Sequence, residues 1–268
     1  MNSVDDVDTN FRQIVNLLSE IKKNDEIDLA CFPENSLYMR IKEGEVIEGL
    51  TLDHKVFSLL KNEANKRGIF LHLGSVAMRV GGQLRNASVT VTPLGEVSIT
   101  YEKIHLFDID IENHAPVRES DVYLHGEEPK ILELHGWHFG QTICYDLRFS
   151  ELFNWYAQHA VEAMLVPASF LVPTGKAHWH VLLRARAIES QAYVIAAAQA
   201  GQHHSLKKSG LRETFGHSLV IDPWGQILAE GNPEGPQLLK VKLDLEKIKA
   251  VRKQIPMANH RRLVQMKR

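Results

Sequence analysis

Cys144 is the residue of this chain whose surroundings best suit covalent chemistry. It ends an expected strand over 139–144 and precedes the pair Tyr145 and Asp146, which leads into an expected helix. A thiol on such a strand-to-helix turn is exposed at a sheet edge, beside backbone N–H groups that can hold an oxyanion. The alternative is a buried thiol that packs as a small apolar residue, and the local sequence leaves both open. For Cys31, inside an apolar run, we expect the packing role.

A cysteine nucleophile needs a base to take its proton and a group that stabilises the developing negative oxygen. Glu34 directly follows an apolar run at 29–33, and Lys103 comes two residues after a run at 97–101. Strand ends are where an α/β fold places catalytic groups. Each charge by itself is more often a solvated loop residue. Together with Cys144 they offer a base, a cation and a thiol at three strand ends.

The elements that must position these residues alternate along the chain. Helices are predicted over 8–23, 52–67, 148–159 and 178–191, where apolar residues recur near the helical period. Strands are predicted over 27–33, 69–76, 87–92, 97–101, 139–144, 162–167 and 192–198, with a last hairpin over 217–222 and 226–229. This alternation indicates an α/β fold in which helices cover the sheets.

Composition narrows the class of protein. The 268 residues include 31 Lys and Arg against 33 Asp and Glu, a net charge of −2 that gives no electrostatic reason to expect nucleic acid or an anionic membrane as partner. Two cysteines cannot form a disulfide framework. The sequence contains no apolar run long enough to span a bilayer and no visible signal peptide. We therefore expect a cytoplasmic protein with one domain over 1–268, of which 250–268 forms a C-terminal tail.

Three separated motifs occur in an order that resembles a known family. They are FPE at 32–34, YEKIHLFD at 101–108 and ICYDLRF at 143–149. This order resembles the nitrilase, or carbon–nitrogen hydrolase, superfamily, whose members carry a Glu-Lys-Cys triad. The resemblance continues through 174–189, 216–218 and 222–225, so it covers nearly the whole chain. Residues 196–204 are most similar to the deaminated glutathione amidase branch, while the omega-amidase branch shares most of the remaining motifs.

The resemblance implies both a fold and a mechanism. The fold is a four-layer α-β-β-α sandwich of the nitrilase type. This sequence departs from the family in having no strand before the position of Met1, either because the start was called too late or because the protein lacks that strand. In the implied mechanism Glu34 accepts the proton of Cys144, and Lys103 stabilises the oxyanion together with the backbone N–H of Tyr145. A second family glutamate matches Glu119 and would orient Lys103 or the substrate amide; a solvated loop acid is its alternative.

Substrate contacts are also implied by the resemblance. Arg148 matches a position that holds a substrate carboxylate, which suits the bidentate geometry of a guanidinium group. The alternative for Arg148 is a structural ion pair with Asp146 or Glu151. Phe170 and Thr174 match positions that line the pocket, although Phe170 could equally be a core residue.

We expect an amidase that releases ammonia from the carboxamide of a small acid through a thioester, with deaminated glutathione as the first candidate. An omega-amidase acting on 2-oxoglutaramate or 2-oxosuccinamate is the alternative within the class. A catalytically silent binding or signalling member of the fold is the alternative outside it. The resemblance further implies at least a homodimer, and we expect no cofactor.

The 14 histidines raise the question of a metal site. The close pairs are His178 with His180 and His203 with His204, on different expected elements, and no acidic residue completes a known ligand spacing. The sequence therefore predicts no metal. His180 stands where many relatives have glutamate, and Lys176 where many have proline, so we expect the pocket wall to differ from theirs.

Overall fold

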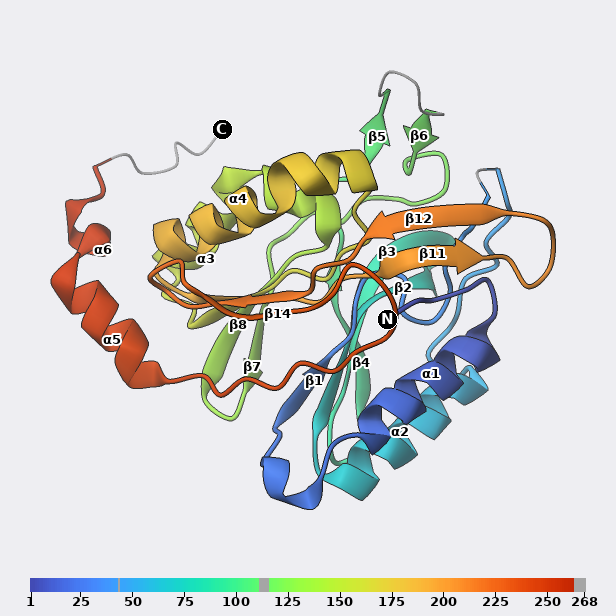
Figure 1. Cartoon of the computed structure of the whole chain (residues 1–268), viewed down its shortest axis with the longest axis horizontal. Helices are drawn as coiled ribbons and strands as arrows, with labels where there is room; N and C mark the ends of the chain where they lie inside the picture. Colours follow the sequence, from blue (N-terminus) through green and yellow to red (C-terminus); the bar gives the residue numbers. More distant parts are fainter. Residues whose placement is uncertain (43, 111–115, 263–268) are drawn as a thin grey trace.

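Two sheets lie face to face between two pairs of helices (Figure 1). The computed structural model describes residues 1–42, 44–110 and 116–262. Helices α1 and α2 cover the outer face of one sheet, and α3 and α4 cover the outer face of the other. A separate apolar cluster fills the space between the sheets. This arrangement confirms the expected four-layer α-β-β-α sandwich.

The first sheet has four strands in the order β1-β2-β3-β4, with β1 parallel to β2 and the other pairs antiparallel. Helix α1 begins after Asp6, whose side chain accepts a hydrogen bond from the backbone N–H of Thr9 and satisfies one of the free donors of the first turn. The elements of this half are α1 Val7–Ser19, β1 Leu29–Cys31, α2 Lys55–Arg67, β2 Phe70–Val80, β3 Gln83–Val91 and β4 Val97–Glu102.

The second sheet has six strands in the order β14-β13-β10-β9-β8-β7, and its three central strands are parallel. A short 3-10 helix, η2 (Cys144–Arg148), joins β8 to α3. The other elements of this half are β7 Ile131–Leu134, β8 Trp137–Gln141, α3 Ser150–Gln158, β9 Ala163–Leu165, α4 Val172–Ser190, β10 Tyr193–Ala196, β13 Leu219–Ile221 and β14 Ile227–Glu230.

Each predicted helix and strand is present, with shifted ends. The strand predicted over 139–144 ends at Gln141, and Cys144 itself has a left-handed backbone conformation with φ of +50°, which an extended strand does not allow. The helix predicted from 178 begins at Val172, since Pro173 fits the first turn, where no amide hydrogen is needed.

Other elements were not predicted, because their sequences are polar or very short. They are η1 Lys23–Asp25, β5 Asp108–Ile109, β6 Val117–Arg118, β7, η2, β11 Ala200–His204, β12 Leu211–Phe215, α5 Leu245–Gln254 and α6 Met257–His260. Helix α5 buries Ile248 and Val251, so part of the segment predicted as a tail packs on the protein. Residues 263–268 of that predicted tail lie outside the described residues. No helix in the described part of the chain is long and apolar enough to cross a membrane.

The free edge of β1 borders a cleft of about 820 Å³, which is also lined by residues 237–243. Among the described residues β1 pairs with β2 alone, so this edge is where a further strand would pair. Cys31 lies on β1 beside the cleft and packs in the cluster between the sheets. Its burial raises the pKa of the thiol to about 12, which agrees with a packing role.

Gly74 sets the separation of the two sheets next to the strand ends that carry Glu34 and Cys144. A Cβ atom at this position would lie 2.1 Å from the backbone oxygen of Phe32 and 2.2 Å from the Cβ of Pro167. Pro167 in turn accepts a hydrogen bond of 2.8 Å from the backbone N–H of Cys144. A side chain at Gly74 would therefore push apart the two strand ends that must meet.

We expect Gly74→Ala to lower the free energy of unfolding by at least about 2 kcal/mol, because added atoms in a packed contact must displace backbone. Urea denaturation followed by far-ultraviolet circular dichroism measures this change. Gly136→Ala is the control, since Gly136 has φ of +77° with open space around its Cβ position. That control should cost about 1 kcal/mol from backbone strain alone. Equal losses in the two variants would contradict the role of Gly74 in sheet separation.

Candidate active site

Glu34 is held at the end of β1 by pairing that continues beyond the strand. The backbone N–H of Phe32 donates to the oxygen of His72 at 2.8 Å, and that of Ser75 donates to the oxygen of Pro33 at 3.3 Å. These bonds fix the backbone on both sides of the turn. The Glu34 side chain is therefore buried in the space between the two sheets.

Lys103 follows β4 directly and is positioned in the same way. Its backbone N–H donates to the oxygen of Asn86 at 2.9 Å, which prolongs the pairing of β3 with β4. Its Nζ lies 3.0 Å from Oε1 of Glu34 and 2.8 Å from Oε2 of Glu119. The lysine side chain is 2% exposed, so both ion pairs are shielded from water.

Glu119 reaches the cluster from the loop after β6. Its Oε2 also accepts a hydrogen bond of 2.7 Å from the backbone N–H of Phe107. The side-chain amide of Asn86 bridges the two carboxylates, at 2.7 Å from Glu119 and 3.2 Å from Glu34. The position of Lys103 is thus determined by two acids that the side-chain amide of Asn86 links. The sequence analysis expected Glu119 beside Lys103 but missed Asn86. Asn86 is the first buried residue of β3, and the sequence of that strand gives no sign of a functional side chain.

Cys144 lies at the start of η2 and lines the same pocket as the lysine and both glutamates. Its φ of +50° is strained for a residue with a side chain, as expected for a nucleophile on a sharp turn. Burial raises the pKa of this thiol well above its ordinary value; the charge of Glu34 raises it further, and Lys103 opposes the shift. The unliganded protein therefore holds a thiol, which needs a base before it can attack.

The two neighbouring carboxylates keep the side chain of Lys103 protonated and positively charged. Burial by itself lowers the pKa of this ammonium group, but the charges of Glu119 and Glu34 outweigh burial and raise the pKa well above its ordinary value. A fixed positive charge beside a buried thiol is suited to stabilising an oxyanion, because no reorganisation is needed when negative charge develops.

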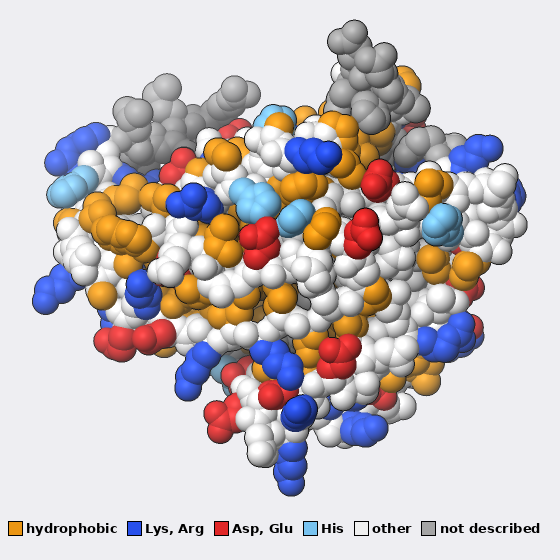
Figure 2. All heavy atoms as spheres, in the orientation of Figure 1, with side chains coloured by type: hydrophobic (Ala, Val, Ile, Leu, Met, Phe, Trp, Pro, Cys, Tyr) orange, Lys and Arg blue, Asp and Glu red, His pale blue; other side chains and the backbone are white. Residues whose placement is uncertain are grey.

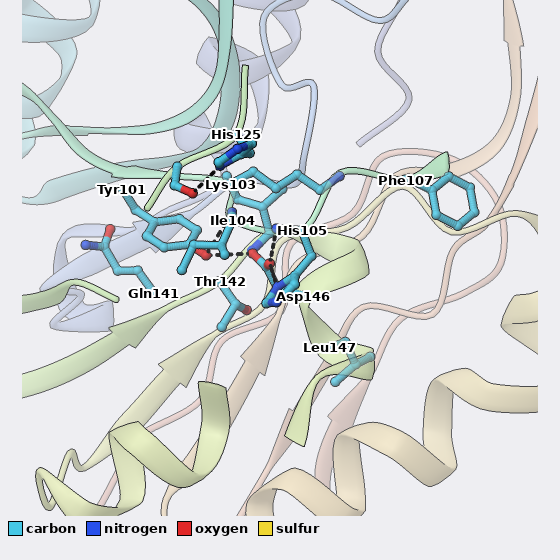
Figure 3. Close-up of polar contacts among 12 residues, drawn as sticks. Tyr101, Lys103, Ile104, His105, Phe107, His125, Gln141, Thr142, Asp146 and Leu147 are labelled. Atoms are coloured by element: carbon cyan, nitrogen blue, oxygen red, sulfur yellow. Dashed lines mark hydrogen bonds and ion pairs between the residues drawn. The ribbon is translucent and has the colours of Figure 1, made fainter. Parts of the chain in front are cut away.

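Asp146 ties the turn of the cysteine to the loop of the lysine (Figure 3). Its Oδ2 accepts hydrogen bonds from the hydroxyl of Tyr101 at 2.8 Å and the backbone N–H of Ile143 at 2.9 Å. Its Oδ1 accepts from the backbone N–H of His105 at 3.0 Å and lies 2.7 Å from the ring Nδ1 of His105. A fully buried carboxylate with these partners joins the chain on either side of Lys103 to the start of η2.

The residues expected to bind substrate lie together but beside the pocket. The guanidinium group of Arg148 lies 5.4 Å from the ring centroid of Phe170, and its Nη1 is 3.1 Å from Nδ1 of His178. The hydroxyl of Thr174 donates to the backbone oxygen of Leu171. In the part of the chain that the structure describes, the lining of the pocket around Cys144 does not include Arg148, Phe170 or Thr174.

Two arginines that sequence reasoning missed do line this pocket. They are Arg40 and Arg212, and Nη1 of Arg212 donates to the backbone oxygen of Arg40 at 3.1 Å. Arg212 lies on β12, in a polar hairpin that periodicity could not detect. Ser169, beside Phe170, also lines the pocket. Tyr145 directly follows Cys144, and its backbone N–H as an oxyanion donor stays a prediction.

The structure combines a four-layer sandwich with a cysteine, a lysine and two glutamates that meet at its strand ends. The sequence resemblance implies this combination for a carbon–nitrogen hydrolase. A family model described as carbon-nitrogen hydrolase matches residues 1–253. The chain belongs to this family and is a hydrolase that acts on carbon–nitrogen bonds.

Individual relatives agree with this assignment. A protein of Yersinia enterocolitica named deaminated glutathione amidase is 35% identical over 260 residues, covering 95% of this chain and 88% of that protein. A protein of the same name from Rattus norvegicus is 38% identical over 263 residues, covering 94% and 77%. The crystal structure of Saccharomyces cerevisiae Nit3, a member of branch 10 of the nitrilase superfamily, matches with a TM-score of 0.78 at 28% identity, covering 96% and 91%.

We expect Asp146→Ala to destabilise the protein by about 3 kcal/mol or more, since it leaves several buried donors without an acceptor. Tyr101→Phe is the matched variant, because it removes a single donor to the same carboxylate and should cost about 1 kcal/mol. Denaturant unfolding of both variants measures the difference. Similar small losses would show that Asp146 does not join the two loops.

Proposed function

We propose that this protein is an amidase that hydrolyses the amide of a small acid, with Cys144 as nucleophile. The observation that carries the proposal is the position of Lys103, paired with Glu34 and Glu119 in the buried pocket that Cys144 lines. A single function explains why the fold brings a thiol, a fixed cation and two carboxylates together away from water. Burying these charges for stability alone would be unfavourable.

The geometry supports a two-stage reaction. Glu34 takes the proton of Cys144 as the sulfur attacks the amide carbon, and the carbonyl oxygen becomes an oxyanion beside Lys103 and the N–H of Tyr145. Glu34 then gives its proton to the departing nitrogen, and the C–N bond breaks to leave a thioester. Next, Glu34 takes a proton from water, whose oxygen attacks the thioester carbon and forms the carboxylic acid. The proton returns to the sulfur as the C–S bond breaks.

The raised pKa of Cys144 explains the need for a paired base. A thiolate formed before substrate arrives would place a further negative charge beside Glu34 in a buried pocket. Proton transfer that accompanies attack avoids this cost, because the charge moves directly to the carbonyl oxygen next to Lys103. In this mechanism Glu119 acts as a positioning residue, since it contacts Lys103 and Asn86.

The names of the relatives support deaminated glutathione as the first substrate to test. This compound carries carboxylates, and Arg40 and Arg212 bring positive charge to the pocket, while Arg148 lies next to it over Phe170. Its amides are secondary, so hydrolysis would release an amine rather than the ammonia expected from a primary carboxamide. The omega-amidase alternative, with 2-oxoglutaramate, would release ammonia.

The same proposal includes a cytoplasmic location, a catalytic domain that spans the chain, and at least a homodimer. The family resemblance supports the single domain and the dimer, while the two free cysteines support the cytoplasmic location. Light scattering of the purified protein measures the oligomeric state, and a monomer at micromolar concentration would overturn the dimer.

We expect the wild-type protein to hydrolyse deaminated glutathione, measured as released amine, faster than 2-oxoglutaramate, measured as released ammonia. Cys144→Ala and Glu34→Gln should each lower kcat by at least about 10³-fold, since they remove the nucleophile or its base. Gln83→Ala, on the exposed start of β3, is a surface control that should keep full activity. A wild type inactive on both amides would favour a silent binding member of the fold.

We expect Arg148→Ala and Arg212→Ala each to raise KM for deaminated glutathione about tenfold or more, while kcat stays within about threefold of the wild-type value. The reason is that each variant loses a charge-assisted hydrogen bond to the substrate, which is worth about 1.5–3 kcal/mol. Steady-state kinetics measure both values. Arg12→Ala, on the outer surface of α1, is the matched control. A KM that stays at the wild-type value would remove that arginine from the substrate site.

A further inference from the structure

Two histidines and one glutamate meet on a surface away from the pocket of Cys144. His180 lies on α4, His217 follows β12, and Glu230 ends β14, so three separate segments converge. Figure 2 shows histidine and acidic side chains next to one another near the centre of the face that it presents. None of the three residues lines the pocket of Cys144.

The donor atoms are close enough to share one ion. Nε2 of His180 lies 2.9 Å from Oε1 of Glu230, and Nδ1 of His217 lies 2.7 Å from the same oxygen. The three donor atoms all lie within 4.8 Å of one another. Ligand atoms about 2.0–2.1 Å from a tetrahedral zinc ion are about 3.3 Å apart. Small rotations of the side chains would therefore bring all three to that spacing.

The two imidazole rings are supported by packed neighbours. The backbone oxygen of His217 accepts a hydrogen bond of 2.7 Å from the indole of Trp179, which is buried on α4 next to His180. The ring centroids of the two histidines are 5.4 Å apart, and that of His217 is 4.5 Å from Phe215. A preformed arrangement lowers the entropy cost of binding an ion.

We propose that His180, His217 and Glu230 form a binding site for Zn²⁺ or a similar borderline divalent cation. Two imidazole nitrogens and one carboxylate oxygen are a ligand set that zinc accepts, with water in the fourth position. The side chains are 24–38% exposed, which leaves room for that water. Each neutral histidine binds through the nitrogen that faces Glu230, and its N–H proton moves to the other ring nitrogen.

Sequence reasoning found no acidic residue at a recognised ligand spacing. The folded chain supplies one from fifty residues away from His180. A bound ion would link α4 to the segment after β12 and to β14. Phe215, which precedes this segment and packs on Gly175 of α4, donates its backbone N–H to the oxygen of Phe170 at 2.9 Å. The ion would thus stabilise the segment whose Phe215 holds the backbone of Phe170, independently of the chemistry at Cys144.

The test uses the Cys144→Ala variant of the whole chain after removal of metals by chelation, so that the thiol of Cys144 cannot bind zinc. We expect equilibrium dialysis against ZnCl2 to give one ion per chain. Thermal unfolding should shift upward by about 5 °C at a free zinc concentration near 100 times Kd. Co²⁺ in place of Zn²⁺ should give the visible absorption of a tetrahedral site.

Two variants in the same background separate this site from adventitious binding. His180→Ala with Glu230→Gln should lose the bound ion, the thermal shift and the cobalt spectrum. His138→Ala removes a different exposed histidine paired with a single glutamate, at 3.1 Å from Glu162, and should keep all three. Absence of binding to the parent protein would overturn the proposal. So would equal zinc binding by the double variant, or equal loss of binding in His138→Ala.

Discussion

The ion pairs of the buried Lys103 ammonium group with Glu34 and Glu119 impose the strictest requirement on the geometry of this fold. Taking three charged groups out of water is costly, and the cost is offset only when their geometry is nearly ideal. The protein meets this requirement by fixing each backbone with hydrogen bonds beyond the strand ends. The side-chain amide of Asn86 donates to Oε1 of Glu119, which Lys103 leaves free, and to Oε1 of Glu34, which Lys103 also contacts. The site is therefore a consequence of precise strand pairing.

The sheets themselves are arranged to meet this constraint. Glu34 and Lys103 come from the first sheet and Cys144 from the second, so the distance between sheets controls the distance between base and nucleophile. Gly74 permits the close approach, and the carboxylate of Asp146 joins the turn of the cysteine to the loop of the lysine. Stability and catalysis share these contacts, because a shift of either loop would expose a buried charge.

Much of the fold could be predicted because its elements have strong local patterns. Helices α1 and α2 bury one apolar face, and the central strands of the second sheet are apolar runs. The β11–β12 hairpin was missed because its strands are polar and form a separate two-stranded sheet. Because that hairpin was missed, Arg212 on β12 was missed as well. Hydrophobic periodicity does not report whether a single arginine lines a pocket.

The class of this protein could be recognised from the sequence, because three motifs in a set order and an alternation of helix and strand are local properties of the chain. The sequence also singled out Glu34, Lys103, Glu119 and Cys144, which the fold brings to one pocket. Tertiary structure alone decided that Arg40 and Arg212 line this pocket, and that Glu230 meets His180 and His217. The contact of Arg212 with Arg40 and that of Glu230 with His180 join distant parts of the chain, so they depend on how the sheets and helices pack.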